Sequence, residues 1–313
     1  MMIMEGGHYC SLCQSNPPYF YFIFGFHIAS SIPLAGAIIS GNESPDVLVT
    51  VDERRRYHVG RSLRTLVTEK PESFFTIEDL SNVSLDPVIH ALEEPMKLFL
   101  INRALFHLLA RRGGICLHGS AIDYRGQGVV FSGASESGKS TMAASFHQMG
   151  HACLSDDHVF VCSHDGKLHL IGDRSPLKLK KDAMDHLNID LAQRKTAMKK
   201  GKYELEACPP AGLKPPLSRI YYLEPDPQRN TIALEKISRM DSLKLLLKNA
   251  RSERAFFDKD NDFKVIDLIC NISGRIPSVN IRYPKKGSFI MTLAQFIELD
   301  LNENDEHFQA ALP

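Results

Sequence analysis

The first third of the chain carries its hydrophobic positions in short runs that turn signals separate. The run over 19–26 is strongly aromatic and predicts a first strand that can be buried on both faces. Two further short strands are predicted at 45–51 and 73–77, because clusters of glycine, asparagine and aspartate break the chain next to them. Residues 1–18 show little pattern. We therefore expect a poorly patterned lead-in followed by a β-rich N-terminal region over 19–92.

The pattern becomes helical over 94–112, where leucine and isoleucine recur three and four residues apart until two glycines end the run. Strand-like segments follow at 115–122 and 129–132, then a glycine-rich loop, a short helix over 140–149 and another strand. This alternation predicts an α/β domain over 93–313. The later elements that we expect are strands at 159–162, 168–171, 220–223 and 281–283 and helices at 241–249, 263–272 and 292–299.

One stretch of this domain lacks a clear period. Residues 178–216 are rich in lysine and interrupted by proline, so we expect either an excursion from the main fold or a mobile region. The basic residues at 194–202 are more typical of a solvated face than of a binding site.

The composition is that of an ordinary globular protein. The 313 residues include 37 basic and 37 acidic side chains, and 43% are hydrophobic, which excludes a disordered chain, a collagen-like repeat and a coiled coil. A net charge of zero argues against binding nucleic acid by bulk electrostatics. No window reaches the roughly 20 apolar residues that span a bilayer, and the first residues lack the basic region of a signal peptide. We therefore expect a cytoplasmic protein with no membrane partner.

The seven cysteines are scattered along the chain, and several lie in apolar runs. That usage is typical of a reduced, cytosolic protein whose cysteines pack as small hydrophobic residues. Cys10 and Cys13 form a lone C-x-x-C with no second pair downstream, which disfavours a zinc site there.

The strongest chemical signal lies at residues 133–140, Gly-Ala-Ser-Glu-Ser-Gly-Lys-Ser, which match the phosphate-binding Walker A pattern G-x-x-x-x-G-K-[ST] in full. The glycines permit close backbone approaches, and the loop N–H groups together with the start of the following helix form a cradle for anionic oxygens. Lys139 would place a positive charge near the β- and γ-phosphates, and the Ser140 hydroxyl could ligate Mg²⁺. The expected nucleotide-binding residues are Gly133, Ala134, Ser135, Glu136, Ser137, Gly138, Lys139, Ser140 and Thr141.

Two consecutive aspartates, Asp156 and Asp157, follow the predicted helix. That helix carries the chain about 15 Å away from the loop, and six residues of strand can bring it back about 20 Å. Adjacent strand residues point to opposite faces, so both carboxylates reach the site only if the strand ends there and the backbone turns. One could then help to hold Mg²⁺ while the other accepts a hydroxyl proton. We expect Asp156 to be the base and Asp157 to lie nearer the metal; the sequence also allows the reverse order.

These residues carry a resemblance to a known family. Residues 116–121 (Cys-Leu-His-Gly-Ser-Ala), the apolar strand before the loop, the loop itself, Gly150-His151 and the aspartate pair resemble the catalytic domain of HPr kinase/phosphorylase in order and spacing. A wider likeness, from Phe22 to Pro284, is to the HPr-kinase-like proteins of lasso-peptide biosynthesis, which phosphorylate a serine of a precursor peptide.

The resemblance implies a P-loop kinase core of the HPr kinase and phosphoenolpyruvate carboxykinase type, which uses ATP and Mg²⁺ to phosphorylate a serine hydroxyl. His118 matches the family's histidine near the phosphate site. The family's downstream E-hydrophobic-R-G motif, associated with its reverse, phosphorolytic reaction, is not found, and residues 172–177 occupy the approximate place. Because HPr kinases are oligomeric, the resemblance also suggests a homo-oligomer. The candidate catalytic residues are His118, Lys139, Asp156 and Asp157.

The leading hypothesis is therefore an ATP-dependent serine kinase that acts on a peptide or small protein. A P-loop ATPase or nucleotide switch is the first alternative, but the chain has no N-K-x-D tetrapeptide to recognise a guanine base. The second alternative is a non-catalytic, nucleotide-binding regulatory module. The presence of Lys139, Ser140 and both aspartates disfavours that module.

Overall fold

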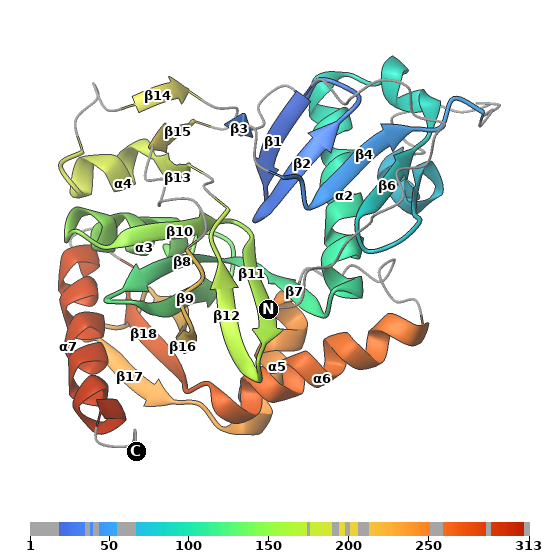
Figure 1. Ribbon diagram of the computed structural model, residues 1–313. Helices are drawn as coiled ribbons and strands as arrows, with labels where there is room; N and C mark the ends of the chain where they lie inside the picture. Colours follow the sequence, from blue (N-terminus) through green and yellow to red (C-terminus); the bar gives the residue numbers. More distant parts are fainter. Residues whose placement is uncertain are drawn as a thin grey trace. The chain divides into compact units, whose positions relative to one another are not determined.

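The computed structural model describes residues 19–34, 38–39, 44–54, 67–173, 176–189, 194–197, 201–205, 213–250, 259–285 and 289–309. The expected lead-in over 1–18, with Cys10 and Cys13, lies outside these residues. The chain divides into two units, Met1–Leu108 and Leu109–Pro313. Each contains helices and strands, so the protein is of the mixed α/β class with several sheets (Figure 1).

The first unit is built around one sheet. Its elements are β1 (Tyr19–Ile23), β2 (Phe26–Ser30), β3 (Ile38–Ile39), β4 (Val47–Val51), η1 (Pro71–Phe74), β5 (Phe75–Ile77), β6 (Asn82–Leu85), η2 (Pro87–Ala91) and α2 (Glu94–Arg111), which continues past the division. The strand order is β3-β1-β2-β4-β6-β5. Strands β2, β4 and β6 run parallel, whereas β1, β3 and β5 pair antiparallel with their neighbours.

The aromatic run at the start of this sheet forms a hairpin, where the sequence predicted a single strand. Phe24 and Gly25, with φ of 53° and 76°, make the two-residue turn between β1 and β2. Positive φ at both central residues is the geometry that matches the twist of the flanking strands. Tyr21 and Phe22, which are adjacent and therefore on opposite faces, are both buried, as the run predicts.

Ring contacts join α2 to this sheet. The Phe106 ring lies 5.0 Å from the ring of Phe24 in the hairpin turn, and the His107 ring lies 5.2 Å from that of Phe75 in β5. Such aromatic pairs stabilise packing beyond the area that they bury. The predicted helix over 94–112 is thus present and contacts the hairpin turn and β5.

The second unit carries the phosphate-loop motif. Its elements are β7 (Gly114–Leu117), β8 (Gly119–Tyr124), β9 (Gln127–Gly133), α3 (Lys139–Gln148), β10 (Ala152–Asp156), β11 (Val159–His164), β12 (Lys167–Ile171), β13 (Leu177–Lys180), α4 (Lys181–His186), β14 (Arg194–Ala197), β15 (Lys202–Leu205), β16 (Leu217–Asp226), β17 (Ala233–Lys236), α5 (Arg239–Asn249), α6 (Lys259–Arg275), β18 (Ser278–Pro284) and α7 (Ile290–Gln309). Strands and helices appear wherever the sequence predicted them in this part. Helices α6 and α7 extend several residues beyond the predicted ends.

A six-stranded sheet with the order β10-β8-β9-β16-β18-β17 forms the centre of this unit. Strands β9, β16 and β18 are parallel, so their carboxyl ends lie at one edge, and the other three strands pair antiparallel with their neighbours. Helices α3 and α7 lie on one face of this sheet, and α5 and α6 lie on the other (Figure 1). Their buried side chains belong to two separate hydrophobic cores. The alternation of Tyr221 and Tyr222 between these two cores follows from the period of two along β16.

The strands of two small sheets, β12-β11-β7 and β13-β15-β14, were predicted only in part. The predicted strand over 115–122 is two strands, because β7 pairs with β11 whereas β8 pairs with β9 and β10. They separate at His118, whose N–H donates to the carbonyl of Asn249 at the end of α5, 2.8 Å away. The stretch over 178–216, expected to be an excursion, contains the whole of β14 and β15 and all of β13 except Leu177. These three strands form the second small sheet.

No helix in the described ranges is long and apolar enough to cross a membrane.

Replacing Gly119 tests how closely β8 must approach β9. A Cβ at this position would lie 2.7 Å from the backbone oxygen of Phe131, and that oxygen cannot rotate away. We expect Gly119→Ala to lower the free energy of unfolding by about 1–3 kcal/mol, the usual cost of overpacking. Urea denaturation measures this change. Lys167→Ala, at an exposed position of β12, is the control and should stay within about 0.5 kcal/mol of wild type. A wild-type midpoint for Gly119→Ala would contradict the close approach.

Candidate functional site

The phosphate-loop motif connects the end of β9 to the start of α3. Gly133 has φ of 144°, and a Cβ there would lie 2.6 Å from the backbone oxygen of Leu223. Gly138 caps α3 with φ of 82°, in the left-handed region. Only glycine adopts such angles without strain, so the two fixed glycines of the motif shape the loop as predicted. The first turn of α3 then presents its backbone N–H groups toward the loop.

Lys139 is turned onto this loop. Its side chain is buried, and Nζ donates to the carbonyl oxygens of Gly133 at 3.0 Å and Ala134 at 2.7 Å. A buried ammonium group needs such partners, because its desolvation is costly. The lysine charge is therefore held at the loop, where an anionic ligand of the cradle would meet it.

Asp156, the last residue of β10, is 2% exposed and lies at the start of α3. Its Oδ1 accepts hydrogen bonds from Ser120 Oγ at 2.7 Å and Ser140 Oγ at 2.8 Å. Its Oδ2 accepts one from the backbone N–H of Lys178 at 2.9 Å. The structure thus brings Asp156 to Ser140, the residue for which the sequence predicted a metal-ligating role. The returning strand reaches the loop as its length predicts.

Asp157 takes a different direction because the backbone turns. Its φ of 75° lies in the left-handed region, which is uncommon for a residue other than glycine. The side chain is 41% exposed, and its Oδ1 lies 3.3 Å from Nδ1 of His118. The same His118 nitrogen lies 3.2 Å from the Asp157 carbonyl oxygen. From the sequence, both carboxylates could reach one region only if the backbone turned at the end of the strand. That turn is present at Asp157.

The oxygens of Ser140 and Asp156 suit a magnesium ion. They lie 2.8 Å apart, and hard oxygen ligands of this kind, one or two from the protein and the rest from phosphate and water, are what Mg²⁺ takes in nucleotide sites. Among the described residues there is no cluster of three or more histidine, cysteine, aspartate or glutamate side chains that could hold a metal. An ion bound by Ser140 and Asp156 would take its remaining ligands from phosphate and water.

Several residues of this region were not predicted from the sequence. Ser120 belongs to the segment 116–121 but carried no role, and the contact of Lys178 uses only its backbone, which no side-chain pattern reveals. Tyr283, at the end of β18, donates its hydroxyl to the carbonyl of Ser137 in the loop at 2.6 Å. Burial raises the pKa of Tyr283 to about 12, so the phenol remains a donor at neutral pH.

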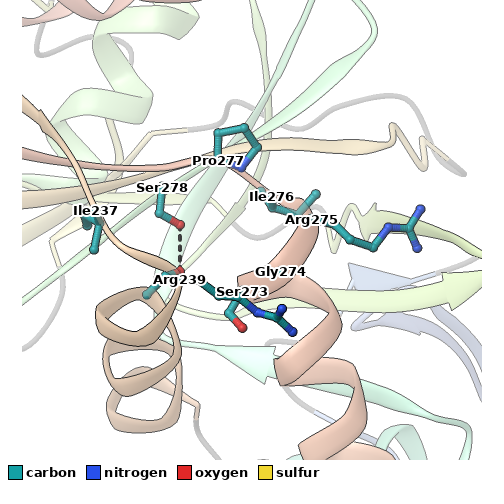
Figure 2. A pocket seen from close by; sticks show the side chains of 9 residues that line it. Ile237, Arg239, Ser273, Gly274, Arg275, Ile276, Pro277 and Ser278 are labelled. Atoms are coloured by element: carbon teal, nitrogen blue, oxygen red, sulfur yellow. Dashed lines mark hydrogen bonds between the residues drawn. The ribbon is translucent and has the colours of Figure 1, made fainter.

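A cavity of about 230 Å³ lies elsewhere in the same unit (Figure 2). Ser242, Ser273 and Ser278 line it together with Arg239 and Arg275. Ser278 begins β18, whereas the loop follows the end of β9, and both strands run parallel to β16. The cavity and the loop therefore lie at opposite edges of the sheet, and the cavity is not the phosphate cradle.

Comparison with known proteins adds one structural likeness. No protein-family model and no curated protein sequence matches the chain. Among solved structures, the chain is similar to the HPr(Ser) kinase/phosphatase from Coxiella burnetii, with 13% sequence identity and a TM-score of 0.30 over 63% of this chain and 99% of that one. A likeness of this size does not establish a family, so the functional conclusions below rest on the geometry of the site.

Replacing Tyr283 tests its support of the loop. Tyr283→Phe removes the donor to Ser137, so we expect the free energy of unfolding to fall by about 1 kcal/mol and nucleotide affinity to fall with it. Because burial raises the pKa of Tyr283 from 10.0 to about 12, this stabilisation should be complete below pH 10 and lost as the pH rises toward 12. Calorimetry measures both quantities. Tyr222→Phe, in the core on the other face, is the matched control and should leave nucleotide affinity unchanged. Equal affinities for Tyr283→Phe and wild type would contradict the support.

Proposed function

We propose that this protein is an ATP-dependent phosphotransferase that transfers the γ-phosphoryl group to a serine hydroxyl of a peptide or small protein. The observation that carries the proposal is the contact of Ser140, at the end of the phosphate-loop motif, with the buried carboxylate of Asp156. A hydroxyl and a carboxylate in this arrangement are the protein's contribution to a magnesium–nucleotide site. The lasso-peptide precursor suggested by the sequence resemblance is the first acceptor to try.

The loop and Lys139 bind the triphosphate in this proposal. Phosphoryl transfer needs positioning and stabilisation of charge on the phosphoryl oxygens more than it needs covalent chemistry. The loop N–H groups and the start of α3 supply donors for these oxygens, and Lys139 supplies a positive charge. Mg²⁺, held by Ser140 and Asp156, would neutralise phosphate charge.

Asp157 is the base in this proposal, which reverses the order favoured from the sequence. The Asp156 carboxylate accepts hydrogen bonds from Ser120, Ser140 and the backbone of Lys178, and it is only 2% exposed, so a substrate hydroxyl cannot reach it from solvent. Asp157 is 41% exposed and can meet a substrate. His118, 3.3 Å from its Oδ1, holds the carboxylate in place. Asp157 takes the serine proton as the hydroxyl oxygen attacks the γ-phosphorus and ADP leaves.

The exposure of Asp157 also supports a second candidate. A carboxylate that reaches solvent can activate water as readily as a serine hydroxyl, which would make the protein an ATPase. The two candidates share the nucleotide site and differ only in the nucleophile.

The acceptor of the phosphoryl group decides between them. The protein should be incubated with ATP and Mg²⁺ and with serine-containing peptides, each paired with a copy in which alanine replaces serine. We expect mass spectrometry to find phosphate on the serine peptides only, and none in excess chelator. Lys139→Ala is the control for the nucleotide site. It should strongly slow transfer, because it removes several kcal/mol of transition-state stabilisation. Release of free phosphate alone, whichever peptide is offered, would establish the ATPase.

Changing the two aspartates separately tests their roles. Asp157→Asn should keep the affinity for ATP and Mg²⁺ near wild type and reduce the rate of transfer by about 10²–10⁴-fold, the usual contribution of a general base. Asp156→Asn should instead weaken the dependence of nucleotide binding on Mg²⁺. Calorimetric titration and single-turnover rates separate these effects. A loss of Mg²⁺-dependent binding in Asp157→Asn, with Asp156→Asn unaffected, would restore the order favoured from the sequence.

A further inference from the structure

Lys180, at the end of β13, forms an ion pair with a residue of the phosphate loop. Its Nζ contacts Oε1 of Glu136, the fourth residue of the motif. Both side chains are well exposed, at 46% and 62%. The phosphate loop thus contains an anionic side chain whose partner is a cation from a different sheet.

The position of Lys180 is fixed by the site itself. The backbone N–H of Lys178 donates to Asp156 at 2.9 Å, which anchors β13 next to the proposed metal position. Lys180 lies two residues further along this strand, and its contact with Glu136 shows that its side chain reaches the loop. A long, flexible lysine there can reach a loop-bound anion as well as Glu136.

Further positive charge surrounds the same part of the loop. The hydrogen bond and charge of Lys180 lower the pKa of the Glu136 carboxyl, and Lys285 and Lys202 add to this effect. Lys202 is the register partner of Lys180 across β13 and β15. Like charges directly opposite each other destabilise a sheet, so an anion between or beside them is favoured. Glu136 is the anion that the protein itself supplies.

Glu136 also adopts an unfavourable backbone conformation. Its φ of 65° lies in the left-handed region, which is sterically unfavourable for a non-glycine residue. Such a conformation persists when the surroundings hold it. The contact with Lys180 is one such restraint, and it would be released if the lysine moved to another anion.

We propose that Lys180 is a further phosphate-binding residue, which Glu136 engages until a polyphosphate ligand takes its place. This proposal rests on the proposed function, because it concerns the nucleotide in the same loop. On binding, the Lys180 ammonium group exchanges the carboxylate for phosphate oxygens. Glu136 therefore lowers the affinity of the loop in two ways, by competing for Lys180 and by repelling the ligand.

The experiment is a double-mutant cycle measured by calorimetric titration of MgATP and of magnesium tripolyphosphate. The proteins are wild type, Glu136→Gln, Lys180→Met and the double variant. We expect Glu136→Gln to lower the Kd about two- to fivefold, as for an exposed ion pair. Lys180→Met should raise the Kd about tenfold, which is at the low end of the effect of losing a hydrogen bond to a charged group. We expect the same increase in the Glu136→Gln background.

The double variant gives the decisive comparison. If Lys180 only neutralises Glu136, Lys180→Met will have no effect once Glu136 is glutamine, and the proposal is overturned. A loss for MgATP without a loss for tripolyphosphate would also overturn it, because the contact would then be to the nucleoside. Failure of wild type to bind either ligand would contradict the proposed function itself.

Two controls separate binding from folding and from general charge. Lys180→Arg keeps the charge and should bind nearly as wild type does. Lys244→Met removes a comparable exposed pair, Lys244 with Asp241 at 3.1 Å on α5, and should leave both Kd values unchanged. Thermal melting shows whether each variant is folded. An equal loss in Lys244→Met would mean that overall charge, and not Lys180, sets the affinity.

Discussion

The buried carboxylate of Asp156 is the constraint on which the arrangement around the loop depends. A charge removed from water must have hydrogen-bond partners, and here the donors come from three elements, Ser120 of β8, Ser140 of α3 and the backbone of Lys178 in β13. Loss of any one donor would leave part of a buried charge unsatisfied. The central sheet, the helix after the loop and a small separate sheet are therefore held together at one point.

The parallel strands determine where that point lies. Because β9, β16 and β18 run in the same direction, their carboxyl ends meet at one edge, and the loop leaves the sheet there. Gly133 pairs with Leu223 at this edge, and Tyr283 at the end of β18 donates to the loop from the other side of β16. The two apolar cores on either face of the sheet hold these strands in register. The loop thus has a rigid frame although it contains two glycines.

The sequence was informative where structure is local. The loop, the helix after it and the strand that returns to Asp156 could be predicted because spacing and glycine positions alone define them. The break at His118 could not, since it depends on β7 finding β11 and on a bond to the distant Asn249. Leucine and lysine alternate over 177–180, but 4 residues are too few to predict β13 within a stretch rich in lysine and proline. The different surroundings of the two aspartates could not be predicted either, because they depend on a left-handed turn at Asp157, which few non-glycine residues adopt.

That turn gives two neighbouring residues of one type different surroundings. Asp156 ends a strand, is 2% exposed and accepts three hydrogen bonds from protein donors, whereas Asp157, with a φ of 75°, is 41% exposed and lies beside His118. Environment, more than residue type, sets what a carboxylate can do in a phosphoryl-transfer site. A buried group with fixed partners can hold an ion in place but cannot approach a substrate. In the proposed mechanism, the exposed Asp157 beside His118 accepts the proton, and the left-handed backbone at Asp157 keeps the two tasks on separate side chains.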